Sequence, residues 1–294
     1  MSRKKNFNYL SHYTYYLPGV GGMFGLLGWM IVGALLGGIV SAIFPLFMNP
    51  QDAMQYGMLV SYPLQFIPAM MFAASRSRTN CINTTGALLD NNHFGKLGGA
   101  VCAIMVSVAT LAGAFCTDAL TSVLPQMPEA LKTVLESLTQ GSLWVNLLCV
   151  AVFAPIFEEW LCRGMVLRGL LHRMKPVWAI VISALFFALI HGNPWQAVPA
   201  FILGCFFGFV YYKTGSLKLT MLMHCVNNGF AVIMSHIDKF KDVESWMEIL
   251  SPQQYWIIFS ACILLFALVV KAFAGIPVQS SKGNCDSVPS LFEQ

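Results

Sequence analysis

Long uncharged apolar runs are the feature that most restricts how this chain can fold. They occupy residues 21–50, 53–75, 97–117, 137–157, 176–212, 219–235 and 249–270. A helix that crosses the hydrocarbon of a bilayer needs about 20 such residues. The run at 176–212 is too long for one crossing and is interrupted by Gly192-Asn193-Pro194, so it predicts two helices. The pattern predicts an all-α, multi-pass membrane protein with about eight transmembrane helices.

Charge supports this interpretation and indicates the orientation. Only 10% of the residues are charged, against about 25% in a soluble domain. All but three of the 17 basic residues fall in loops on the same side as the basic N-terminal segment, which contains Arg3, Lys4 and Lys5. The positive-inside rule therefore predicts that both termini are cytoplasmic, with the protein in the cell membrane. Because the net charge of +4 is spread over loops, we expect no nucleic-acid partner.

Four polar side chains stand out within the apolar half of the chain: Glu158, His191, His224 and Asn228. Ionisable groups are expensive in lipid, so they usually face a bundle interior or a water-filled cavity and mark function. A carboxylate, two imidazoles and a carboxamide are also the groups expected of a hydrolase that activates water. The four residues are therefore candidates for a catalytic site.

Helical spacing separates the two adjacent acids. Glu159 and Arg163 are four residues apart and share a helix face, so we expect them to form a structural ion pair. Glu158 lies about 100° around the helix and has no local partner, which leaves it available as a base. Pro155 removes a backbone donor, and α-helical spacing predicts that the carbonyl of Ala151 loses its partner.

The histidines are placed by similar arithmetic. A turn near residues 174–176 lies about 16 residues from both Glu158 and His191, so an antiparallel hairpin brings the two to similar depth. His191 follows Phe187 by four residues and shares its face. His224 and Asn228 form another pair with this spacing, which alone could serve only as interhelical hydrogen-bonding. Together with the acid and the other histidine, it favours a shared site.

The three motifs, EExxxR at 158–163, FxxxH at 187–191 and HxxxN at 224–228, resemble those of a known family. In this order they are similar to the CAAX-protease and bacteriocin-processing (CPBP or Abi) family of intramembrane endopeptidases, which includes the type II CAAX prenyl endopeptidases. The resemblance covers residues 142–236. It implies that Glu158 and His191 activate water and that His224 and Asn228 stabilise the oxyanion. Supporting roles fall to Glu159, Arg163 and Phe187.

These observations divide the chain into three regions. Residues 1–136 form an N-terminal region with three spans, residues 142–236 form the catalytic core, and residues 249–275 form the last transmembrane helix, followed by a cytoplasmic tail at 276–294. The predicted function is hydrolysis of a peptide bond in a membrane-associated protein or peptide. The alternative is a non-catalytic immunity or partner-binding scaffold, and a proton-relaying transporter is a third possibility.

Whether zinc takes part is left open by the sequence. Glu158, His191 and His224 can in principle hold Zn²⁺ with one position open for water. However, there is no HExxH spacing and asparagine is a poor zinc ligand, so a metal-free, glutamate-dependent mechanism is slightly favoured. The nine cysteines contain no CxxC pair and predict neither a thiolate zinc site nor a disulfide framework.

Overall fold

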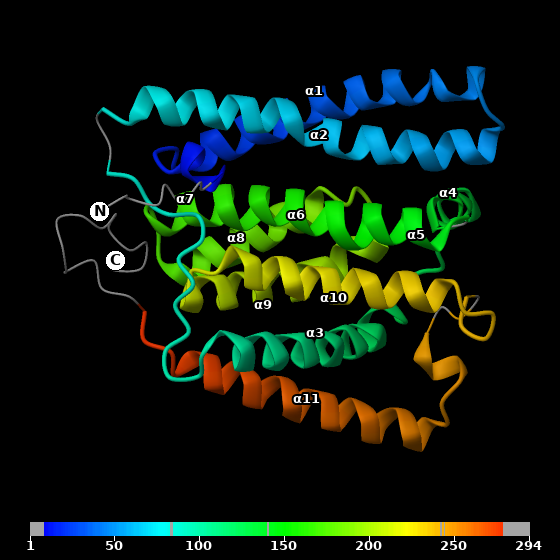
Figure 1. Ribbon diagram of the computed structural model, residues 1–294. Coiled ribbons are helices and arrows are strands. Elements are labelled where there is room, and N and C mark those ends of the chain that lie inside the picture. The colour runs from blue at the N-terminus through cyan, green and yellow to red at the C-terminus, as the bar shows by residue number, and fades with distance from the viewer. Residues whose placement is uncertain (1–8, 83–84, 140, 242, 244, 279–294) are drawn as a thin grey trace, which may run out of the picture.

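The computed structural model describes residues 9–82, 85–139, 141–241, 243 and 245–278, and this part of the chain is a bundle of helices without strands (Figure 1). Seven of its helical segments are long and apolar enough to cross a bilayer. The protein is therefore a multi-pass membrane protein, as predicted. The long segments are α1 (Val20–Ser41), which continues through η2 (Phe44–Leu46), α2 (Pro50–Asn80), α3 (Gly99–Thr121), the segment Leu143–Leu171, α9 (Pro194–Thr214), α10 (Leu217–Ser235) and α11 (Pro252–Ala274).

The eighth predicted helix is present as α8 (Pro176–Leu189), but it is short. Its 14 residues extend about 21 Å, less than the roughly 30 Å of a bilayer's hydrocarbon. The chain turns where the sequence predicted a break: Gly192 has a φ of +70°, and Asn193 caps α9 by accepting the Gln196 N–H at 2.9 Å. The apolar run at 176–212 therefore becomes one short helix and one full span.

The helices are arranged in layers (Figure 1). The α1–α2 hairpin covers one side of the bundle, α3 and α11 lie on the opposite side, and the motif-bearing helices lie between them. The short η1 (Tyr9–Tyr13) and the C-terminal end of α11 lie at the same end of the bundle. The basic residues Arg3, Lys4 and Lys5, and tail residues 279–294, lie outside the described residues. The cytoplasmic location of the termini thus stays a prediction.

The segment Leu143–Leu171 is irregular, although it is continuous. It consists of α5 (Leu143–Asn146), the π-helical η3 (Leu147–Phe153), α6 (Ala154–Glu159), the π-helical η4 (Trp160–Leu167) and α7 (Arg168–Leu171). In η3, the Ala154 N–H bonds to the Cys149 carbonyl, five residues back. The carbonyl that Pro155 leaves without a backbone donor is therefore that of Val150. The prediction that Pro155 frees the Ala151 carbonyl was wrong because it assumed α-helical spacing. π-Helical stretches often mark functional sites.

A buried arginine ties this segment to the N-terminal part of the chain. Arg168 is fully buried and its guanidinium donates to the carbonyls of Ala87 at 2.6 Å, Tyr13 at 2.8 Å and Tyr16 at 2.7 Å. Backbone carbonyls thus replace the water that a guanidinium would otherwise need. The contacts fix the end of η4 and α7 and so help to hold in place the acids, which lie nine and ten residues earlier in the chain.

Candidate active site

A charged network occupies the interior of the bundle, and Glu159 is at its centre. The Glu159 Oε1 atom accepts from Arg163 Nη1 at 2.7 Å and lies 3.0 Å from His224 Nδ1. The side chains of Glu159 and Arg163 are 0% exposed, and that of His224 is 4% exposed. The ion pair predicted from the spacing is present. The sequence did not predict that Glu159 also contacts the imidazole ring of His224, the histidine of the HxxxN motif.

Arg163 is enclosed by aromatic rings as well as by its acid partner. Its guanidinium carbon lies 4.5 Å from the Phe187 ring centre and 5.3 Å from that of Phe207, distances at which a cation is attracted to a ring face. Its Nη2 donates to the Gly204 carbonyl at 3.0 Å. A Cβ at Gly204 would come within 3.2 Å of Phe187, so glycine permits this close packing. Arg163 thus joins α8 and α9 to the helix that carries the acids.

Glu158 points elsewhere and has a partner from another helix. Its Oε1 accepts a hydrogen bond from the Tyr62 hydroxyl of α2. Its Oε2 lies 4.0 Å from His224 Nε2 and has no hydrogen-bond partner among the residues that the structure describes. A separation above 3.5 Å is one that a water molecule can bridge. Glu158 and His224 therefore face each other at a distance longer than a direct hydrogen bond.

His191 lies at the end of α8 and is half-buried. Its Nδ1 is 2.8 Å from the Phe187 carbonyl, which can only accept, so the proton is assigned to Nδ1 and Nε2 is left free. In the described part of the chain no hydrogen bond or ion pair joins His191 to Glu158. His191 is linked to His224 instead, because the Phe187 ring lies edge-to-face with His191 at 4.9 Å and with His224 at 5.4 Å.

Asn228 serves the backbone of the irregular helix. Its Nδ2 donates to the Val150 carbonyl at 2.9 Å, the same carbonyl that Pro155 leaves without a backbone donor. Its Oδ1 accepts from Asn227 Nδ2 at 3.1 Å. A carboxamide nitrogen carries two protons, so one N–H remains available after the bond to Val150. The oxyanion role that the resemblance implied therefore rests on this second N–H.

The side chains do not fit a metal ion in this arrangement. Within the described residues, no group of three or more His, Cys, Asp and Glu side chains lies close enough together to hold one. The two ring nitrogens of His224 already face Glu159 and Glu158, and one oxygen of Glu158 is taken by Tyr62. Zinc needs three protein ligands converging on one point, with water at the fourth position. The candidates Glu158, His191 and His224 do not converge in this way.

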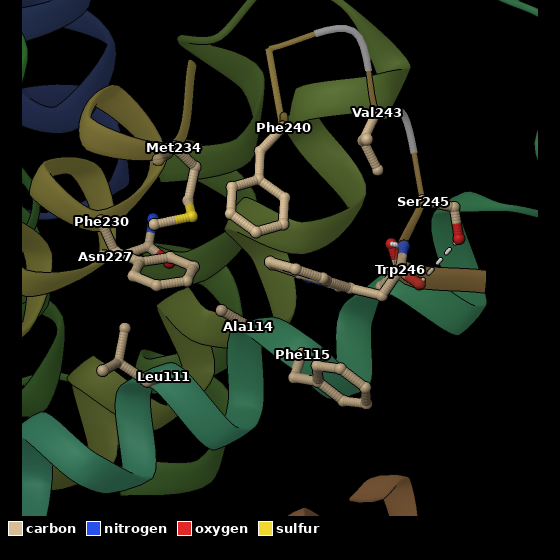
Figure 2. A pocket seen from close by; sticks show the side chains of 12 residues that line it. Leu111, Ala114, Phe115, Asn227, Phe230, Met234, Phe240, Val243, Ser245 and Trp246 are labelled. Atoms are coloured by element: carbon tan, nitrogen blue, oxygen red, sulfur yellow. Dashed lines mark hydrogen bonds between the residues drawn. The ribbon is translucent and has the colours of Figure 1, made fainter. Parts of the chain in front are cut away.

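A cavity of about 290 Å³ lies beside these residues, between α3, α10 and the segment that follows α10. Figure 2 shows the rings of Phe230, Phe240 and Trp246 around it, with Phe115 below. Of the HCVNN segment, only Asn227 lines this cavity, and the predicted site residues do not. The cavity therefore lies on a different face of α10 from His224 and Asn228.

Comparisons with known proteins agree with the position of the motifs. Residues 140–230 match the family model of the type II CAAX prenyl endopeptidase Rce1-like proteins. The chain is 30% identical over 91 residues to the membrane-embedded CAAX protease MroQ of Staphylococcus aureus (strain USA300), covering 29% of this chain and 36% of MroQ. It is 26% identical over 108 residues to YdiL of Bacillus subtilis (strain 168), whose name assigns it provisionally as a membrane peptidase, covering 37% of this chain and 43% of YdiL.

The similarity is confined to the motif-bearing part. The chain matches less than half the length of each of these two relatives. No solved structure matches the chain. The matched region contains all three motifs, and with them Glu158, His191, His224 and Asn228. Residues 140–230 are therefore similar to the Rce1-like family, which is the similarity that the three motifs predicted.

Proposed function

We propose that this protein is an intramembrane endopeptidase of the cell membrane, in which Glu158 and His224 act on a water molecule between them. The observation that carries the proposal is the 4.0 Å separation of Glu158 Oε2 and His224 Nε2, inside a segment that is Rce1-like. The two side chains are 13% and 4% exposed, so water that reaches them is largely shielded from bulk solvent. Shielding strengthens the electrostatic effect of each group on the reacting atoms.

In this mechanism Glu158 is the general base. The water attacks the carbonyl carbon of the scissile bond, its proton passes to Glu158, and a new C–O bond forms. The C–N bond then breaks, and the proton passes from Glu158 to the leaving amine, so that an acid and an amine are released. Proton transfer by a positioned group contributes about 10²- to 10⁴-fold to the rate.

The remaining groups orient the reactants. Glu159 accepts from His224 Nδ1 and so fixes the ring with Nε2 toward the space beside Glu158. His224 Nε2 in its protonated form and the free N–H of Asn228 are donors for the oxyanion. Removing one such donor from a hydrolase costs about 10²- to 10³-fold in kcat. His191, whose Nε2 has no hydrogen-bond partner among the described residues, is assigned to activating the water together with Glu158, as the resemblance implies. None of these steps requires a metal.

The substrate is a membrane-associated protein or peptide. The names of the matched family and of MroQ refer to CAAX sequences, and the family name refers to prenyl groups. We extend this substrate class to the present chain as part of the proposal. Because the site lies within a bundle of membrane-spanning helices, the scissile bond reaches it from a substrate anchored in the same bilayer.

The test is cleavage by purified protein in liposomes. The probes are three labelled peptides: a farnesylated peptide ending in a CAAX sequence, a double-glycine leader peptide and a single-spanning peptide. We expect the wild type to cleave at least one probe, Glu158→Gln to lose at least 10³-fold in kcat, and Glu129→Gln, an exposed control in α4 (Glu129–Thr139), to retain full activity. Full activity of Glu158→Gln would refute the mechanism. A wild type that cleaves none of the probes would favour the non-catalytic scaffold.

A further inference from the structure

Tyr62 is the feature of the site that lies farthest from the motifs in the sequence. It belongs to α2, outside the Rce1-like residues 140–230, and is 96 residues away from Glu158. Its hydroxyl nevertheless donates to Glu158 Oε1. A phenol in the middle of an apolar span needs a hydrogen-bond partner, because lipid offers none. The contact therefore gives a buried hydroxyl an acceptor and a buried carboxylate a donor.

Aromatic packing holds the two helices at this contact. The Tyr62 ring lies 5.7 Å from the Phe66 ring, one turn further along α2. Phe66 is 1% exposed and stacks on Phe157, with centres 5.4 Å apart and planes at 13°. Phe157 directly precedes Glu158. Two successive aromatic contacts thus fix α2 against the turn of α6 that carries the base, and the Tyr62 hydroxyl has little freedom to leave Glu158.

The two carboxylate oxygens of Glu158 consequently have different surroundings. Oε1 is held by Tyr62, whereas Oε2 is directed to His224 Nε2 across 4.0 Å. Rotation of the carboxylate would break the bond to Tyr62, so this bond selects the orientation in which Oε2 faces His224.

We infer that Tyr62 is a positioning residue of the active site, which orients the Glu158 carboxylate, and that α2 forms one wall of the site. This inference rests on the proposed function, because it assumes that Glu158 is the base. It adds a residue from a helix that carries none of the three motifs. The competing explanation is that Tyr62 only stabilises the fold by satisfying a buried carboxylate.

The experiment compares Tyr62→Phe with the wild type in the liposome assay, with Tyr56→Phe as the control. Tyr56 lies on the same helix but is 47% exposed. We expect Tyr62→Phe to lower kcat about 10- to 100-fold while KM stays within about twofold, because a hydrogen bond to a charged group that acts in the reaction is lost. We also expect the pH profile of kcat/KM to differ from that of the wild type. Tyr56→Phe should match the wild type in all three.

A second measurement does not depend on activity. The infrared difference spectrum between the wild type and Glu158→Gln isolates the carboxyl bands of Glu158, and Tyr62→Phe should shift these bands. The inference is overturned if Tyr62→Phe keeps the wild-type kcat and pH profile, or if it only lowers the thermal midpoint while the folded fraction stays fully active. Either result leaves the proposed function intact. If the wild type cleaves nothing, or Glu158→Gln is fully active, the proposed function itself fails.

Discussion

Replacing Arg163 with methionine removes the only cation that faces Glu159 apart from the titratable His224, within the described residues. The two charged groups are 2.7 Å apart and both are 0% exposed. At an effective dielectric constant of about 20, this distance corresponds to about 6 kcal/mol of attraction. The substitution also ends the cost of burying the guanidinium, so the net loss is smaller. Breaking a buried pair from one side costs about 3–5 kcal/mol, and we expect this loss in the free energy of unfolding.

The assay is thermal unfolding of the purified protein in detergent. A loss of 3–5 kcal/mol corresponds to a midpoint lower by roughly 6–20 °C. The exposed Arg78 supplies the control, because Arg78→Met should leave the midpoint within about 2 °C. Glu159→Gln combined with Arg163→Met should recover much of the loss, since no unpaired charge then remains. If the double variant is as unstable as Arg163→Met alone, the loss comes from packing against the rings, and the electrostatic reasoning is refuted.

Three further predictions concern the helix irregularity, the loop histidine and the metal. Asn228→Leu should cost about 1–3 kcal/mol by leaving the Val150 carbonyl without a donor, and adding Pro155→Ala, which supplies a backbone N–H, should restore most of the thermal midpoint. Burial lowers the pKa of His172 below 6.5, so folding stability should fall as the pH decreases below 6.5, where the unfolded state binds more protons; His172→Gln should flatten the midpoint between pH 5 and 7. Treatment with a zinc chelator should leave peptide cleavage unchanged, and loss of cleavage that added Zn²⁺ restores would contradict the metal-free mechanism.

Much of this architecture follows from local regularities that a sequence reveals. Apolar runs of about 20 residues locate the spans because lipid requires them. The spacing of Glu159 and Arg163 predicts their ion pair because residues four apart share a helix face. The motif order predicts the Rce1-like segment. In each case the relevant partners are close in sequence or the pattern repeats along one helix.

Contacts between helices could not be predicted in this way. Tyr62 looks like any phenol in an apolar span, and only the fold brings it to Glu158. The second partner of Glu159, His224, lies 65 residues away, so spacing gave no indication of it. The effect of Pro155 on the backbone was also misjudged where the helix changes type. In η3 the backbone hydrogen bonds run five residues back instead of four. The carbonyl that loses its donor at Pro155 is therefore that of Val150 and not that of Ala151.

The irregular helix also explains why an asparagine follows the histidine at this spacing in α10. Asn228 donates one N–H to the Val150 carbonyl. A carboxamide is neutral and carries a second N–H on the same nitrogen, which stays available for another acceptor. An aspartate at this position would place a carboxylate oxygen against the carbonyl, and both atoms only accept. A serine has a single O–H proton and would have none left for substrate. A side chain that both supports the π-helical stretch and retains a donor for an oxyanion therefore has to be an amide, and Asn228 connects the shape of the acid-bearing helix to the chemistry proposed for it.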